Sequence, residues 1–167
     1  MVGWIIGQLD LLKGVRKKFD KELYDQFDGP AKHAMQVHLE LSGHTVTVPP
    51  ENYGVDLHST LGDLKMYHEV EVSQGWKSGY HPFLLGSVPE RKIRLKAMEA
   101  GKPLYFWMLR LDLRRAVCFG SYCLQDKFLV EVPNKQIESG EYFYRIPKTL
   151  GKEFDLLPVT EKDIFDA

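Results

Sequence analysis

The chain has 167 residues, of which 44% are hydrophobic and 27% are charged, and its formal net charge is −1. This composition excludes a disordered chain and predicts one globular domain over residues 1–167. The near-zero total charge also excludes a uniformly basic protein, although a polarised surface remains compatible with it. Basic residues gather at positions 13–21, 91–96 and 110–115. Each of these clusters is most simply a solvated face.

The chain has two cysteines, Cys118 and Cys123, at a spacing that is not typical of metal ligands. They are expected to be buried free thiols in a reducing cytoplasm. The N-terminal segment lacks the basic leader and the cleavage site of a signal peptide. No apolar run reaches the roughly 18 residues that a membrane span needs. We therefore expect a cytoplasmic or nucleoid-associated protein without a membrane partner.

The first part of the chain predicts two helices. Apolar residues recur at three- and four-residue steps over positions 8–27. Gly29-Pro30 then predicts a break, with Asp28 as the N-cap of a second helix from about 30 to 42. Gly43 is expected to end this second helix.

The pattern after Gly43 changes from helix to strand. Short strands are predicted at 44–48, 53–58 and 64–72. The turn residues Gly62-Asp63 predict a hairpin between the second and third of these strands. Residues 74–86 contain several glycines and a proline, which indicates a loop.

A third helix is predicted to begin at Ser87, because Ser87 and Glu90 match a capping box and Gly101 matches a helix end. Strands follow at 104–113 and 116–119, and shorter strands and turns are expected over 124–167. The order predicts an α/β domain with a mixed central sheet flanked by helices on both faces. Its core spans about 28–120, with 124–167 as an additional C-terminal segment.

Acidic residues concentrate on the two strands of the predicted hairpin. Side chains alternate along a strand, so Glu69 and Glu71 share one face, and Asp56 and His58 share one face of the preceding strand. The hairpin brings Asp56 against both glutamates. Carboxylates are costly to gather without a counter-charge, and Mg²⁺ prefers such oxygen ligands. The pattern indicates a Mg²⁺ or Mn²⁺ site on Asp56, Glu69 and Glu71, in which the metal activates water.

A simpler interpretation of the acidic residues remains open. Glu-Val-Glu on an edge strand is also typical of a stripe that faces solvent. His58 is an auxiliary metal ligand or proton shuttle on one interpretation, and a hydrogen-bonded structural histidine on the other. His33, His38 and His44 have no ligand spacing, so they predict no site.

Residues 28–120 resemble the PD-(D/E)XK nuclease superfamily, which includes restriction endonucleases and Holliday-junction resolvases. The resemblance rests on Gly54-Val-Asp56, on the strand His68-Glu-Val-Glu-Val72 and on the order of the predicted elements. Twelve residues separate Asp56 from Glu69, an interval typical of the family. The resemblance implies a restriction-endonuclease-like fold and hydrolysis of DNA phosphodiester bonds, with endonuclease action favoured. A homodimer would suit double-strand cleavage.

This chain departs from the family at one position. The family usually has Glu-x-Lys where this chain has Glu69-Val-Glu71. Glu71 would then act as the general base or as an additional metal ligand, or a lysine from elsewhere would fill the gap. Lys65, Lys77 and Lys92 are the candidates, and we favour Lys92 as the catalytic one.

Basic and aromatic residues around the third predicted helix suit a DNA backbone. The expected nucleic-acid contacts are Arg91, Lys92, Arg94, Lys96, Lys77 and Trp76. Two other interpretations stay open: the charges of the helix are simply solvated, and the loop aromatic is a local plug of the core. Because the usual lysine is missing, the alternative is a catalytically inactive nuclease fold that binds DNA or supports an assembly. A metal-dependent hydrolase of a small substrate is a third interpretation.

Overall fold

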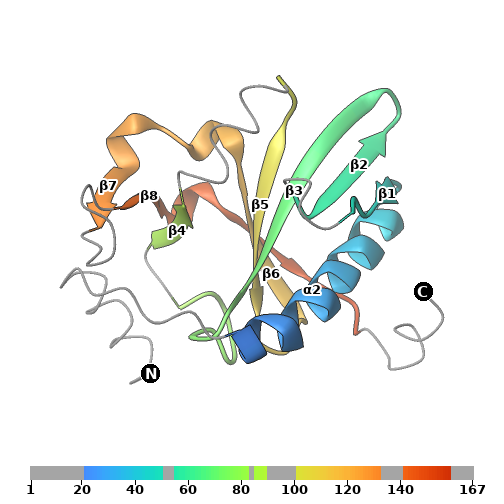
Figure 1. Ribbon diagram of the computed structural model, residues 1–167, viewed down its shortest axis with the longest axis horizontal. Coiled ribbons are helices and arrows are strands. Elements are labelled where there is room, and N and C mark those ends of the chain that lie inside the picture. The colour runs from blue at the N-terminus through green and yellow to red at the C-terminus, as the bar shows by residue number, and fades with distance from the viewer. Residues whose placement is uncertain (1–20, 51–54, 83–84, 90–100, 133–140, 159–167) are drawn as a thin grey trace.

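The computed structural model describes residues 21–50, 55–82, 85–89, 101–132 and 141–158 (Figure 1). In these residues the helix is α2 (Lys21–Leu41), and the strands are β1 (Thr45–Thr47), β2 (Leu57–Leu61), β3 (Leu64–Ser73), β4 (Leu85–Pro89), β5 (Leu104–Arg110), β6 (Arg115–Gly120), β7 (Leu129–Val132), β8 (Glu141–Pro147) and β9 (Lys152–Asp155). Three short 3₁₀ turns complete this part of the chain: η1 (Ser121–Cys123), η2 (Asp126–Phe128) and η3 (Lys148–Leu150).

The described strands form two sheets. One sheet has six strands in the order β1-β2-β3-β5-β6-β9, and the other has three in the order β4-β8-β7. In the larger sheet β3 and β5 run parallel, while the other neighbouring pairs are antiparallel, so the predicted mixed sheet is confirmed. The predicted hairpin is also confirmed, because Leu61 pairs with Leu64 across Gly62-Asp63. Gly62 supplies the positive φ, 59°, that such a tight turn requires.

Helix α2 corrects the prediction of two separate helices. It continues through Gly29 and Pro30, and Pro30 lies inside it. An internal proline costs about 3 kcal/mol in a helix. The apolar stripe of α2 offsets this cost, because four apolar residues of the helix are buried against the sheet: Ala31, Ala34, Met35 and Leu39. The predicted end is confirmed: Gly43 has φ 89°, and the next amide, that of His44, donates to the carbonyl of Leu39 at 3.0 Å.

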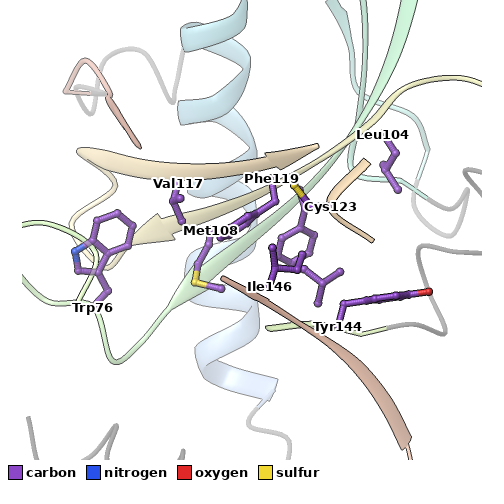
Figure 2. Close-up of a cluster of buried hydrophobic side chains, with 10 residues drawn as sticks. Trp76, Leu104, Met108, Val117, Phe119, Cys123, Tyr144 and Ile146 are labelled. Carbon is purple, nitrogen blue, oxygen red and sulfur yellow. The ribbon is translucent and has the colours of Figure 1, made fainter. Parts of the chain in front are cut away.

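The two faces of the larger sheet are covered by different elements (Figure 1). Helix α2 packs on one face with Leu57, Trp107 and Leu109, and we call this the helix face. The small sheet packs on the other face, the second face, where Tyr144 and Ile146 meet core residues of β5 and β6. Figure 2 shows this second cluster, with Met108, Val117 and Phe119 at its centre.

The prediction of the third helix is wrong at its N-terminus, because the first residues of that helix belong to β4 of the small sheet. Ser87 lies within β4 and pairs with Arg145 of β8, so it is not a helix cap. Val88 is fully buried, and Gly86 lies so close to Phe119 that an added Cβ would come within 2.7 Å of the ring. The rest of that predicted helix, and residues 8–20 of the first one, lie outside the described residues.

Two further expectations concern cysteines and membranes. Both cysteines are free, as predicted, and Cys123 is buried, whereas Cys118 is only partly buried. Burial raises the pKa of the Cys118 thiol to about 12, with a further contribution from Cys123. Among the described residues, no helix combines the length and the apolar character needed to cross a membrane.

Candidate active site

Asp56 lies in a bend immediately before β2, at a break in the strand alternation. Val55 packs on the second face, whereas Leu57, two residues later, packs on the helix face. The Asp56 carboxylate therefore sits at the open end of the hairpin, where β2 begins and β3 continues beyond its pairing with β2. Its Oδ2 accepts a hydrogen bond from the backbone N–H of Val70 at 2.8 Å. This bond fixes the carboxylate beside the residue that separates Glu69 from Glu71.

A lysine from the helix completes the surroundings of Asp56. The Nζ of Lys32 lies 3.1 Å from Oδ1 of Asp56 and 2.8 Å from Oδ2 of Asp28, one helical turn earlier. Burial lowers the pKa of Lys32, but the two carboxylates outweigh burial and raise the pKa above its ordinary value. The sequence pattern did not single out Lys32. Lys32 lies four residues after Asp28 and next to Ala31 of the buried stripe, and this position was the available sign that it lies beside the sheet.

The side chains of Glu69 and Glu71 project from β3 on the second face. Their neighbours on β5 are Phe106 and Met108, both members of the second-face core. Glu69 is buried, with 8% of its surface exposed, whereas Glu71 is exposed. The two glutamates thus share a face, and Asp56 reaches the same short stretch of β3 from its edge.

The described residues bring few metal donors together. Among them, no three His, Cys, Asp or Glu side chains form a group that could hold a metal ion. Mg²⁺ needs only one or two protein carboxylates and otherwise binds water and substrate oxygens. Asp56, in the bend before β2, and buried Glu69 of β3 are oxygen donors of that kind, although both oxygens of Asp56 are engaged by Val70 N–H and Lys32.

His58 lies on the second face, away from the Asp56 carboxylate contacts. It pairs with Tyr67, and the two rings meet edge to face at a centroid distance of 4.8 Å. Burial and the nearby ammonium of Lys102 lower the pKa of His58. Lys102 donates to the Tyr67 hydroxyl at 3.2 Å, so His58 belongs to a small polar group with these two residues.

The predicted DNA contacts divide into three groups. Trp76 is fully buried in the second-face core, so its ring offers no surface to a base, which corrects that expectation (Figure 2). Lys77 is exposed in the same loop. The predicted contacts on the third helix, Arg91, Lys92, Arg94 and Lys96, lie outside the described residues.

A buried chain of hydrogen bonds on the helix face was not predicted. Trp107 Nε1–H donates to Nδ1 of His68 at 3.0 Å, which leaves the imidazole proton on Nε2. That proton is donated to the Ser59 hydroxyl oxygen at 2.7 Å, and the hydroxyl then donates to Nδ1 of His44 at 3.0 Å. Burial, with smaller contributions from His44 and His58, lowers the pKa of His68 to about 4. His68 is therefore neutral and holds β2 to β3 and β5.

The similarity of this chain to known proteins is confined to solved structures. No protein-family model matches the chain, and no curated protein matches it. Among solved structures, the chain is similar to Hjc, a Holliday junction resolvase from Archaeoglobus fulgidus, an archaeal hyperthermophile. The two are 12% identical, with a TM-score of 0.43, over 70% of this chain and 87% of that one. This likeness is too weak to carry an inference about activity.

Proposed function

We propose that this protein is a Mg²⁺- or Mn²⁺-dependent deoxyribonuclease that hydrolyses phosphodiester bonds within DNA. The observation that carries the proposal is the hydrogen bond from Val70 N–H to the Asp56 carboxylate. It holds one carboxylate at the point of β3 where buried Glu69 and exposed Glu71 leave the strand. The resemblance of Gly54-Val-Asp56 and His68–Val72 to the PD-(D/E)XK pattern supports the same residues.

Each residue of the site has a distinct chemical role in this proposal. Asp56 and Glu69 would hold the cation, which supplies a Lewis acid for the charge that develops on the phosphate. Glu71, being exposed, accepts a proton from the attacking water or adds a ligand. Lys32, paired with two carboxylates, is a fixed positive charge that orients the phosphate and does not act as a base.

Lys32 is an alternative to Lys92 as the lysine that the family usually has beside its second carboxylate. The contact between Lys32 and Asp56 supports Lys32, while Lys92 remains a proposal from sequence. Lys77 and the basic residues 91–96 would bind the DNA backbone and supply affinity that depends on salt. His58 is retained as an auxiliary proton shuttle, and two copies of the chain would cut the two strands of a duplex.

The ion pair between Lys32 and Asp56 also favours a second function. Both oxygens of Asp56 already have partners, Val70 N–H and Lys32 Nζ. Glu71 also stands where the family has lysine. These features suit a nuclease fold that binds DNA or supports an assembly without cleaving it.

The two functions separate in a cleavage assay on supercoiled plasmid with Mg²⁺, Mn²⁺ or EDTA. We expect cleavage with either cation and none with EDTA. Asp56→Asn should lower the rate by about 100-fold or more, as is typical when a group that acts in the reaction is removed. Glu131→Gln, at an exposed carboxylate of β7, is the matched control and should cleave as the wild type does.

The identity of the lysine is tested in the same assay. Lys32→Met should abolish most of the cleavage, whereas Lys65→Met, at an exposed position of β3, should not. If Lys92→Met is the inactive variant instead, the catalytic lysine is on the third predicted helix. DNA binding without cleavage under every metal condition would favour the non-catalytic module.

A further inference from the structure

The loop that follows β3 is held against the sheet at several points. Trp76 Nε1–H and Arg110 Nη1 both donate to the carbonyl of Gly79, at 3.2 and 2.8 Å. The His81 amide donates to Oε1 of Glu153 at 3.1 Å, and Lys148 Nζ donates to the His81 carbonyl. Residues on both sides of Tyr80 are therefore fixed to β5, β9 and the segment after β8.

Tyr80 is displayed by this loop instead of being packed beneath it. Its side chain is 72% exposed, although it lies between two residues whose backbones are tied down. The Arg115 guanidinium lies 4.3 Å from the centroid of its ring. Arg115 is itself fixed by Asp155 at 2.6 Å and by Glu153 at 3.5 Å. The ring is thus oriented by a cation–π contact before any partner arrives.

The loop that carries Tyr80 and the segments that hold it have a net positive charge, although Arg110, Arg115 and Lys148 are paired with carboxylates. The loop and the strand ends that hold it contribute five basic side chains against three carboxylates. The basic ones are Lys77, Arg110, Arg114, Arg115 and Lys148, and the acidic ones are Asp112, Glu153 and Asp155. Lys77 and Arg114 are both exposed. We call Tyr80 together with Lys77, Arg114 and Arg115 the Tyr80 surface.

The Tyr80 surface lies on the same face of the sheet as the glutamates. Cross-strand pairing places Glu71, Met108, Val117 and Glu153 in one row from β3 to β9. His81, the residue after Tyr80, packs its Nε2 at 3.3 Å from the Met108 sulfur. Neighbouring strands are about 4.8 Å apart, so Glu153 lies three strand spacings, or about 14 Å, from Glu71.

We propose that the Tyr80 surface binds single-stranded DNA, with an unpaired base stacked on the Tyr80 ring and the flanking phosphates near Lys77 and Arg114. An exposed aromatic ring among cations is how proteins bind single strands with little sequence preference, because every base has a π face. A ring that is already oriented by Arg115 loses little conformational freedom on binding. The inference rests on the proposed function in that it assigns DNA with unpaired nucleotides beside the acidic site as the substrate class.

Binding is measured without cleavage, by fluorescence anisotropy in EDTA with a labelled single-stranded oligonucleotide and with a blunt duplex of the same sequence. The wild type should bind the single strand more tightly than the duplex. Tyr80→Ala should weaken single-strand binding by about 5- to 150-fold, the range for loss of one stacked base. Tyr80→Phe, which keeps the ring, should bind as the wild type does. Tyr122→Ala is the matched control, since Tyr122 is 71% exposed in η1, which follows the far end of β6.

A second readout reports stacking directly. Oligonucleotides that carry 2-aminopurine should show one position whose fluorescence is quenched by the wild type and by Tyr80→Phe, but not by Tyr80→Ala. Equal affinities of the wild type and Tyr80→Ala, or no preference for the single strand, would overturn the inference. Single-strand binding through Tyr80 by a protein that never cleaves DNA would leave the inference standing and refute the nuclease proposal alone.

Discussion

The neutral, buried imidazole of His68 makes the stability of this fold dependent on pH. His68 is 1% exposed, and its Nδ1 accepts the Trp107 indole proton while its Nε2 proton goes to Ser59. A protonated ring would have a second N–H pointing at the indole donor. Burial, followed by the charges of His44 and His58, accordingly lowers the pKa of His68 from 6.5 to about 4.

The sign and size of the effect follow from the two pKa values. Between pH 6.5 and about 4 the unfolded chain binds a proton at His68 and the folded protein does not. The contribution of His68 is therefore complete above pH 6.5, and it is lost progressively as the pH falls to about 4. At about 1.4 kcal/mol per pH unit, that interval corresponds to about 3 kcal/mol.

Urea unfolding at pH 7, 5.5 and 4.5 measures this loss. The wild type should lose stability at each step, and His68→Gln, which does not titrate, should lose about 2.5 kcal/mol less between pH 7 and 4.5. Nitrogen-detected NMR of the imidazole rings at pH 7 should show the proton of His68 on Nε2. A folded-state titration of His68 near 6.5, or a proton on Nδ1, would refute the hydrogen-bond assignment.

Three smaller predictions concern single side chains. Gly86→Ala should destabilise the protein by about 1–3 kcal/mol, because its Cβ would overlap a buried ring. Gly29→Ala, in open space on α2, should stabilise it by about 0.5–1 kcal/mol. Urea unfolding measures both changes. Cys118, whose pKa is about 12, should react with a disulfide reagent at pH 8 only after unfolding, and rapid reaction of the folded protein would contradict its burial. Lys32→Met should lower the free energy of unfolding by about 1–2 kcal/mol at pH 7, because it removes two half-buried ion pairs. If its urea midpoint equals that of Lys65→Met, at an exposed position, these pairs add nothing to stability.

Local patterns predicted the parts of the fold that local interactions determine. Gly62-Asp63 fixes its hairpin because a two-residue turn with positive φ admits few other structures. Gly43 ends α2 for a similarly local reason. The capping-box pattern at Ser87 misled, because β4 is selected by pairing with β8, more than fifty residues away. Pro30 misled because burial of one continuous stripe on α2 outweighs the local cost of a proline.

Local patterns likewise predicted some residues of the candidate site and missed those that depend on contacts between distant segments. Alternation along β3 correctly placed Glu69 and Glu71 on one face, since this part of the strand, Tyr67–Ser73, is paired in register with β5. Asp56 does not follow alternation, because the bend before β2 turns its carboxylate toward Val70 N–H and α2. Lys32 was missed because its partner lies on another element, and no spacing in the sequence encodes that contact. Trp76 looked like a loop aromatic, but the loop folds back and buries its ring.

The account depends most on Glu69, a buried carboxylate with a proposed role at a cation. The direct measurement is single-turnover cleavage of a labelled DNA substrate by the wild type and by Glu69→Gln, with and without Mg²⁺, after matching folded fractions by circular dichroism. The account predicts cleavage that requires both Mg²⁺ and the Glu69 carboxylate. Equal, Mg²⁺-dependent cleavage by folded Glu69→Gln, or no cleavage by the wild type in Mg²⁺ or Mn²⁺, would contradict it.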